Sequence, residues 1–215
     1  MSPRHASLVV TAALAALCLF GIPAKSFASV VAHLTLQSEP GDYIGQGGSY
    51  DIRYRSPGPS SFSAQILKYL PDGRPAQVHF GFWNDDDLSN TFALLYFGTD
   101  QLGIPIQPGT YPDARRMNWG LPGHPEMWIH FQHRSGEPVE GSFTVTEATF
   151  FKQNRVTEIG SFAATFEQRV SQSPATLRGT FTYRNLDAPT AIPEPGSLAL
   201  LGSAVVGVLM SRRRR

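Results

Sequence analysis

Residues 161–168 read SFAATFEQ, and residues 176–185 read TLRGTFTYRN. In both stretches the large hydrophobic residues fall on alternate positions, with polar or small residues between them. These hydrophobic residues are Phe162, Ala164 and Phe166, then Leu177, Phe181 and Tyr183. A period of two predicts β-strands with one face buried, because successive side chains of a strand point to opposite faces.

The same alternation recurs elsewhere, as in GSYDIRYRS (residues 48–56) and EMWIHFQHR (residues 126–134). Turn-forming stretches separate these runs: SPGPSS, PDGRP, QPGTYPD, LPGHP and RSGEP. We count roughly nine strands in about 160 residues, a spacing typical of antiparallel all-β domains. The sequence therefore predicts an antiparallel β-sandwich, of jelly-roll or immunoglobulin-like type, over residues 29–188.

The first 28 residues differ from this domain and match a secretory signal peptide. Arg4 precedes an apolar run over residues 6–20, and Ser26 and Ala28 supply small residues at the −3 and −1 positions of a cleavage site. We expect a signal helix that signal peptidase removes after Ala28. Cys18, the one cysteine of the chain, lies within this segment, so the mature domain has no disulfide and no cysteine-based site.

The last 27 residues form three short segments. Residues 189–195 are a linker that ends in Pro193, Glu194 and Pro195, and residues 196–211 form a hydrophobic transmembrane or sorting helix. The chain ends in four arginines, Arg212, Arg213, Arg214 and Arg215. The uncharged part of the helix would span only ~23 Å, against ~30 Å for a hydrocarbon core. The arginines hold the end of the chain on the cytoplasmic side.

The order of the PEP triplet, short apolar helix and terminal arginines, combined with a signal peptide, resembles a PEP-CTERM sorting-domain protein. The resemblance implies passage through the inner membrane of a Gram-negative bacterium and transient C-terminal anchoring. It further implies cleavage near Pro193, Glu194 and Pro195 by an exosortase and delivery to the cell surface or extracellular matrix. The alternative is a plain C-terminal membrane anchor.

The middle of the chain is also similar to other PEP-CTERM ectodomains. The shared stretches are SEPGDYIGQG, PGTYPDARR, GSFTVTEATF and FEQ…ATLRGTFTY, which occur in this order from residue 38 to residue 183. The resemblance implies no particular activity. Relatives often carry cysteines near the third and fourth stretches, and this chain has none there.

The charge of the domain argues against nucleic-acid binding. The chain has 18 Lys and Arg and 17 Asp and Glu; two of the basic residues lie in residues 1–29 and four in residues 196–215, where there are no acids. The remainder has 12 basic and 17 acidic residues, a net charge of −5. No basic surface of the kind that binds nucleic acid is predicted.

Two groups of residues are weighed as metal ligands. Asp85, Asp86 and Asp87 form an acidic loop that suits calcium, and Asp100 and Asp113 would complete the site if the fold brought them near. The loop lacks EF-hand spacing, and a solvated turn is the simpler interpretation. His130 and His133 are predicted to face opposite sides of a strand, which excludes a shared zinc ion. No cofactor is otherwise expected.

No motif of a known enzyme class is present: the sequence lacks GxSxG, HExxH, a P-loop and a dinucleotide fingerprint. We interpret the aromatic residues Trp83, Trp119, Trp128 and Tyr111 as a candidate glycan-binding surface, because flat rings beside polar groups suit sugar rings. The alternative is that they are core residues.

Three functional hypotheses remain. The leading one is a non-catalytic surface or matrix protein that contacts exopolysaccharide. The second is an envelope glycan hydrolase, which requires two carboxylates in one cleft. The third is a structural matrix subunit that self-associates through an exposed strand edge.

Overall fold

The computed structural model describes residues 29–56, 61–83, 92–116, 121–136, 139–170 and 173–189. Within these ranges the chain is built almost entirely from β-strands, with one 3₁₀ turn, η1 (Asp100–Leu102). The strands are β1 (Val30–Ser38), β2 (Ser49–Arg55), β3 (Ser61–Tyr69), β4 (Pro75–Trp83), β5 (Phe92–Gly98), β6 (Gly109–Arg115), β7 (Glu126–Phe131), β8 (Val139–Gln153), β9 (Val156–Val170) and β10 (Thr176–Asn185). The all-β prediction is confirmed.

All ten strands belong to one hydrogen-bonded sheet in the order β2-β1-β10-β9-β8-β6-β7-β5-β4-β3. Neighbours are antiparallel except β6 and β7, which are parallel and share one register pair, Arg115 with Glu126. The sheet is open, with β2 and β3 at its edges. The described residues form a single sheet, so the predicted sandwich of jelly-roll or immunoglobulin-like type is not shown.

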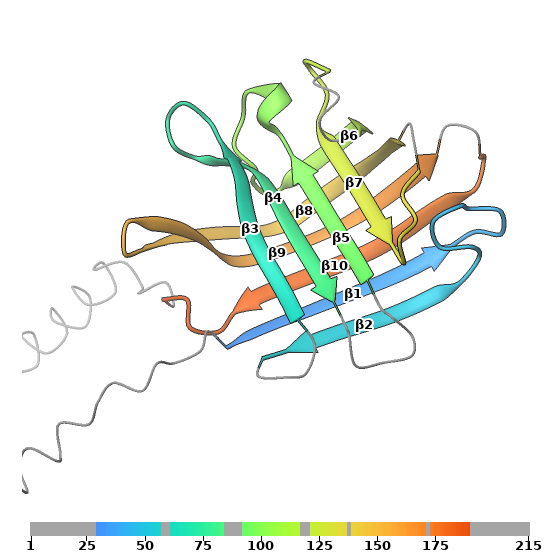
Figure 1. The fold of residues 1–215 in the computed structure, drawn as a ribbon. Coiled ribbons are helices and arrows are strands. Elements are labelled where there is room, and N and C mark those ends of the chain that lie inside the picture. Colours follow the sequence, from blue (N-terminus) through green and yellow to red (C-terminus); the bar gives the residue numbers. More distant parts are fainter. Residues whose placement is uncertain are drawn as a thin grey trace, which may run out of the picture.

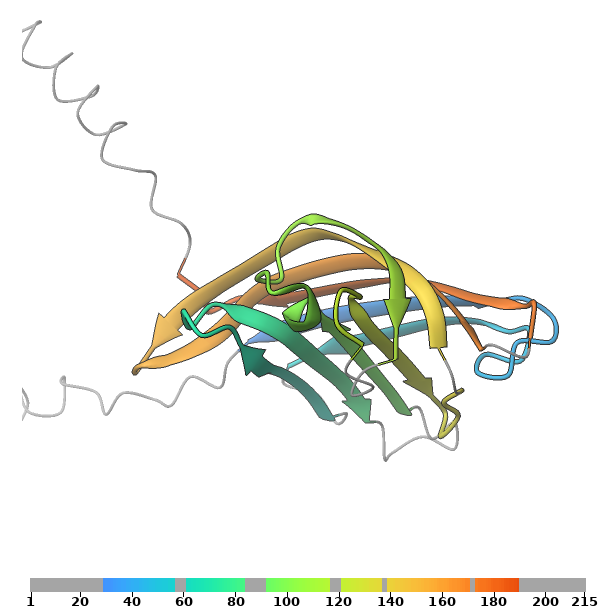
Figure 2. The ribbon, with the colours of Figure 1, turned by 90° about the horizontal axis from the view of Figure 1, so that it is seen from above.

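The sheet folds over itself at the short β6–β7 contact (Figures 1 and 2). We call β3, β4, β5 and β7 the front half, and β1, β2, β6, β8, β9 and β10 the back half. Figure 1 shows the front strands crossing the back strands, and Figure 2 shows the back half arching over the front half. Each half therefore has an inner face toward the other half and an outer face away from it.

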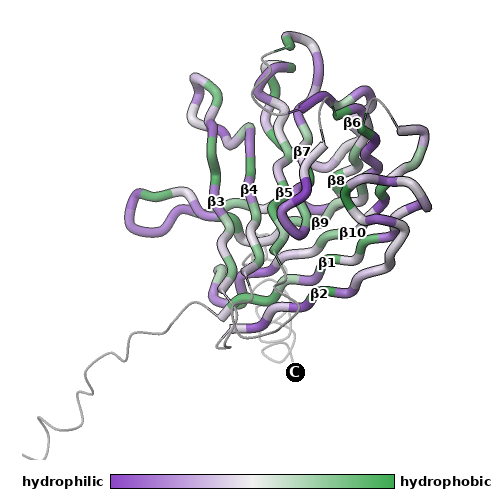
Figure 3. Tube along the Cα trace, turned by 45° about the vertical axis from the view of Figure 1, so that its right-hand side comes forward, coloured by the Kyte–Doolittle hydropathy of each residue, from purple (hydrophilic) through white to green (hydrophobic). Residues whose placement is uncertain are grey.

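Aromatic side chains fill the space between the two halves. Phe80 of β4 packs against Phe181 of β10 and Phe162 of β9, with ring centroids 4.5 and 5.1 Å apart. Phe97 of β5 packs against Phe162 and against Phe143 of β8, at 5.5 and 5.2 Å. Since all five rings are fully or almost fully buried, their removal from water is a main source of stability. The alternation first seen in residues 161–168 is the inner face of β9, and Figure 3 shows the same change of hydropathy along neighbouring strands.

One polar side chain links the halves through the core. Gln168 of β9 is fully buried, accepts a hydrogen bond from the Ile129 N–H (2.9 Å) and donates one to the Ile129 carbonyl (3.3 Å). Ile129 lies in β7, which pairs with β5 on one side but meets β6 only at Glu126. The amide of Gln168 thus takes the place of a neighbouring strand, and the backbone groups of Ile129 stay paired although they are buried.

The longest hairpin is β8–β9, in which each strand has 15 residues. Asn154 and Arg155 connect the strands, and both have positive φ (51° and 69°). Positive φ at both positions of a two-residue loop is characteristic of a type I′ turn, whose twist matches that of the strands.

Residues 107–113, predicted as a turn, contain most of β6 instead. Gly109–Arg115 pairs with β8, with an irregularity between Tyr111 and Ala114. Asp113, inside this irregularity, has φ of 54°. Pro112 lies there as well, where the interrupted ladder does not require its missing N–H. The Pro and Gly signals therefore mark a bulged strand.

The loop between β1 and β2, residues 39–48, is organised by Asp42. Its buried carboxylate accepts hydrogen bonds from the Ser38 hydroxyl and the Gly45 N–H, both at 2.7 Å. Ile44, in the same loop, is fully buried in the core. Arg134 donates to the Ile44 carbonyl (2.9 Å) and so ties the loop to the end of β7.

Asp42→Ala is expected to lower the free energy of unfolding by about 1–3 kcal/mol, because the Gly45 N–H loses its acceptor and Ile44 loses its support. Urea unfolding followed by circular dichroism measures this. Asp72→Ala, in an exposed turn, is the matched control and should change stability by less than about 0.5 kcal/mol. Equal stability of the two variants would contradict the assigned role of Asp42.

The predicted signal peptide with its Ala28 cleavage site, and residues 190–215 of the tail, lie outside the described residues. Within the described part of the chain, no helix is long and apolar enough to cross a membrane.

Candidate functional site: an aromatic outer face

The outer face of the front half carries an unusual set of aromatic side chains. Two of the four predicted residues lie here, Trp83 at the end of β4 and Trp128 in β7. Strand β5 lies between them and adds Phe92 and Tyr96 from the same face. Because β4, β5 and β7 pair in register, these rings form rows across neighbouring strands.

In one row the side chains stack on one another across three strands. His79 of β4 lies against Tyr96 of β5 (4.3 Å between ring centroids, 23° between planes), and Tyr96 lies against Trp128 of β7 (5.3 Å, 30°). The Arg116 guanidinium covers the indole of Trp128, 5.2 Å from the ring centroid. Since both faces of Tyr96 are covered, this row supports the sheet and offers ring edges, rather than ring faces, to a ligand.

Trp83 lies differently, over the strand itself. Its six-membered ring crosses Gly81, where a Cβ would lie 2.2 Å from the indole Cη2 atom. Gly81 is two residues before Trp83 on the same face of β4, so the absence of a side chain there lets the indole lie down on the sheet. Trp83 is partly exposed, so part of its indole remains accessible for packing against a sugar ring.

Phe92 and His133 continue this surface. Phe92 is opposite Trp83 in the β4–β5 register, with ring centroids 6.4 Å apart. The imidazole of His133 stacks on Phe92 at 4.8 Å with only 7° between the planes, and His133 is exposed. We call Trp83, Phe92 and His133 the aromatic corner. It lies where β4 and β7 end and β5 begins.

His130 and His133 do not lie on opposite faces as predicted. Strand β7 ends at Phe131, and the next two residues, Gln132 and His133, have positive φ (46° and 60°). This turn brings His133 back to the outer face, so that His130 and His133 both contact Phe92. The prediction assumed a regular strand through residue 133, and the turn invalidates it.

The buried histidines of this face are neutral near pH 7. Burial lowers the pKa of His79 to about 4. Burial also lowers the pKa of the half-buried His130; a hydrogen bond to the His133 backbone offsets part of this lowering, and the electrostatic effect of His133 adds a smaller lowering. The imidazole rings of His79 and His130 therefore make the outer face near the aromatic corner polar without adding a positive charge.

Several buried polar atoms on this face have no hydrogen-bond partner within the described part of the chain. They are Ser63 Oγ, His79 Nε2, Trp128 Nε1 and His130 Nε2. Buried polar groups are nearly always paired, because leaving one unpaired costs about 1–3 kcal/mol. Their concentration on one face distinguishes it from the outer face of the back half, where hydroxyl and charged groups pair with one another, as Thr35 does with Thr180 (2.6 Å).

Tyr111 must be removed from the predicted surface. Its side chain, 5% exposed, stacks on Phe143 in the core at 4.8 Å. Its hydroxyl donates to the Gln107 carbonyl (2.8 Å) and so fixes the segment that leads into β6. The alternative interpretation, a core residue, is correct for Tyr111. Trp119 lies outside the described residues.

The predicted calcium ligands Asp85, Asp86 and Asp87 also lie outside the described residues. Asp100 and Asp113 already have side-chain partners: Lys68 contacts Asp100 at 2.9 Å, and Arg115 and His124 contact Asp113. Among the residues that the structure describes, no group of three or more His, Cys, Asp or Glu is arranged to hold a metal ion.

Two carboxylates do approach each other near the outer face, but around an ammonium group. Lys68 contacts Asp100 (2.9 Å) and Glu126 (3.7 Å), and Glu126, 3% exposed, also accepts a hydrogen bond from Gln77 (2.9 Å). Burial alone would lower the pKa of Lys68, but the hydrogen bond to Asp100 and the two negative charges outweigh burial and raise this pKa. Two carboxylates that share one ammonium group in this way differ from the free acid and base of a glycosidase.

The comparisons with known proteins concern the C-terminal segment. Residues 191–215 match the PEP-CTERM protein-sorting motif. The chain is therefore an exosortase substrate, exported and sorted to the cell surface, and the predicted resemblance is confirmed. No curated protein and no solved structure is significantly similar to the chain.

Proposed function

We propose that this chain is a non-catalytic surface or matrix protein whose β-domain contacts extracellular polysaccharide through the aromatic corner. The observation that carries the proposal is the indole of Trp83 lying flat on Gly81, with Phe92 and His133 beside it. Ring C–H groups of sugars pack on such faces, and nearby imidazole groups bond their hydroxyls. The sorting motif, which implies sorting to the cell surface, supports this proposal.

The non-catalytic part of the proposal is supported by the ion pairs of three acids, Asp100, Asp113 and Glu126. Asp100 and Glu126 share Lys68, and Asp113 is held by Arg115 and His124. Hydrolysis of a glycosidic bond needs one carboxyl group that donates a proton and a second that stabilises or attacks the sugar. Carboxylates already bound to cations are poorly suited to either task.

Trp83→Ala is expected to weaken binding to the purified extracellular polysaccharide of the producing bacterium about tenfold, a change that corresponds to about 1.4 kcal/mol, because the variant lacks the largest ring of the aromatic corner. Co-sedimentation of the full chain in mild detergent, with added calcium and with chelator, measures this. Trp83→Phe should retain part of the affinity. Loss of binding on chelation would point to Asp85, Asp86 and Asp87 as further participants.

The control is Tyr69→Ala, which removes an exposed aromatic ring from β3, at the opposite end of the β3–β4 pair from Trp83. Its binding should equal that of the wild type. Undiminished binding by Trp83→Ala, or no binding by the wild type, would refute the proposed function. Release of reducing sugar by the wild type would favour the hydrolase instead.

A further inference from the structure

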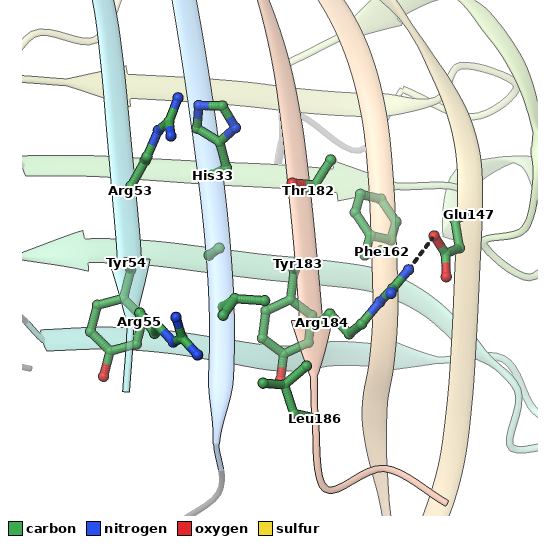
Figure 4. Close-up of a pocket in the computed structure, with 12 residues that line it drawn as sticks. His33, Arg53, Tyr54, Arg55, Glu147, Phe162, Thr182, Tyr183, Arg184 and Leu186 are labelled. Atoms are coloured by element: carbon green, nitrogen blue, oxygen red, sulfur yellow. Dashed lines mark ion pairs between the residues drawn. The ribbon is translucent and has the colours of Figure 1, made fainter. Parts of the chain in front are cut away.

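An open groove of about 620 Å³ lies away from the aromatic corner, at the end of the back half where β1 begins and β10 ends. Residues of β1, β2 and β10 line it, and β8 and β9 contribute at its far side (Figure 4). Its charged residues come from the solvent-facing positions of their strands and are His33, Arg53, Arg55, Glu147 and Arg184.

Two arginines stand on either side of a small apolar residue. Val31 of β1 is in register with Arg55 of β2 and with Arg184 of β10. The two arginines are thus two strand spacings apart, about 10 Å between Cα atoms. Arginine side chains are long enough to converge over Val31, and their planar guanidinium groups suit two-point contacts with a carboxylate.

The acids near the groove leave this pair of arginines largely available. Asp51 is already bound by Arg53 (2.9 and 3.1 Å) and by His33 (3.0 Å). The hydrogen bond to Arg53 is the main cause of the lowered pKa of Asp51, so this carboxylate stays ionised and paired. Glu147 contacts Arg184 only at 3.9 Å (Figure 4). Arg55 is exposed and forms no ion pair with any residue that the structure describes.

The sign of the charge here is opposite to that of the domain. Arg53, Arg55 and Arg184 outnumber Asp51 and Glu147, although the chain between its two end segments has a net charge of −5. The lining also includes two apolar residues, Val31 and Leu186, and the hydroxyl-bearing Thr182. Leu186 is 48% exposed. A ligand that matches this lining carries an anionic group, hydroxyls and an apolar ring face.

We propose that the groove binds a carboxylate-bearing sugar unit of an acidic polysaccharide, with Arg55 and Arg184 holding the carboxylate over Val31. Thr182 and His33 then contact the sugar hydroxyls, and Leu186 packs against ring carbons. This inference rests on the proposed polysaccharide contact and adds the charge of the polymer and a second place of attachment.

The test compares the full chain in mild detergent with polygalacturonate as the acidic probe and dextran as the neutral one. The double variant Arg55→Gln/Arg184→Gln is expected to lose at least tenfold in affinity for polygalacturonate, whereas its affinity for dextran is unchanged. Binding of the wild type to polygalacturonate should weaken with added salt. Arg74→Gln, which removes an exposed arginine from a distant turn, should bind as the wild type does.

Wild-type binding to polygalacturonate no tighter than to dextran, or equal binding by the double variant, would overturn the groove proposal. So would equally tight binding of dextran sulfate, a polyanion without carboxylates, or of phosphatidylglycerol vesicles, because either result would indicate a site for any polyanion or for a lipid surface. If the host polysaccharide still binds in a Trp83-dependent manner, these results leave the proposed function intact. If no polysaccharide binds at all, both proposals fail.

Discussion

Replacing Pro193, Glu194 and Pro195 together by alanine is expected to abolish surface delivery. The triplet lies within the matched sorting motif, residues 191–215, and the motif is what makes the chain an exosortase substrate. Two prolines also keep a segment extended and outside a helix, the form in which a processing enzyme can reach the backbone. Without them the uncleaved chain should accumulate in the inner membrane. Cell fractionation and the mass of the protein in each fraction measure this.

Pro189→Ala is the matched control, because Pro189 lies just before the motif. Its processing should be unchanged, and the shortened form should reach the surface in wild-type amount. Deletion of residues 191–215 should give a third result, an exported domain that is no longer retained by the membrane. Normal cleavage of the triple variant would contradict the assignment of the triplet as the recognition element.

Gln168→Leu is expected to destabilise the domain more than any other substitution described above, by about 2–5 kcal/mol. Leucine preserves most of the volume but leaves the N–H and the carbonyl of Ile129 buried without partners. The loss arises from these two backbone groups and from the weaker attachment of β7 to the back half. Urea unfolding of wild type and variant gives the difference directly.

Gln65→Leu makes the same change at an exposed position of β3 and should have little effect. Gln168→Glu serves as a milder variant in case the leucine variant does not fold. At a pH where its side chain is protonated, glutamic acid has an acceptor for the Ile129 N–H and an O–H donor for the carbonyl, so its loss should be smaller than that of the leucine variant. The loss should increase at a pH where the carboxyl group ionises, because the donor disappears and a buried charge is created. Equal unfolding midpoints for Gln168→Leu and wild type would show that β7 does not depend on this contact.

Much of the fold can be predicted from period-two alternation, but only where one face of a strand meets water. Strands β1, β9 and β10 satisfy this condition, and the alternation even places Gln168 on the inner face with Phe162, Ala164 and Phe166. Strand β4 does not, because eight of its nine residues are buried. Aromatic rings cover the outer face of β4, so its outward-facing residues need not be polar. The alternation of polar and apolar residues is therefore absent from this strand.

The candidate site could be predicted only in part, because some of its residues come together through strand pairing that the sequence does not reveal. Trp83 and Trp128 stand out as large aromatic residues, but Phe92 and His133 become relevant only through pairing of β5 with β4 and through the turn after Phe131. Tyr111 was misplaced because Pro and Gly around it resemble a turn. The arginine pair around Val31 depends on the register of β1 with β2 and with the distant strand β10, which no local pattern reveals.

The position of β10 has a mechanical consequence. The sorting motif follows this strand, so any attachment through the C-terminal tail would pull on the domain through β10. β10 is an inner strand with nine register pairs to β1 and nine to β9. A force on the end of β10 acts along the strand. It therefore shears the hydrogen bonds to β1 and to β9 together, instead of breaking them one pair after another. A domain attached in this way resists detachment under flow far better than one held by an edge strand.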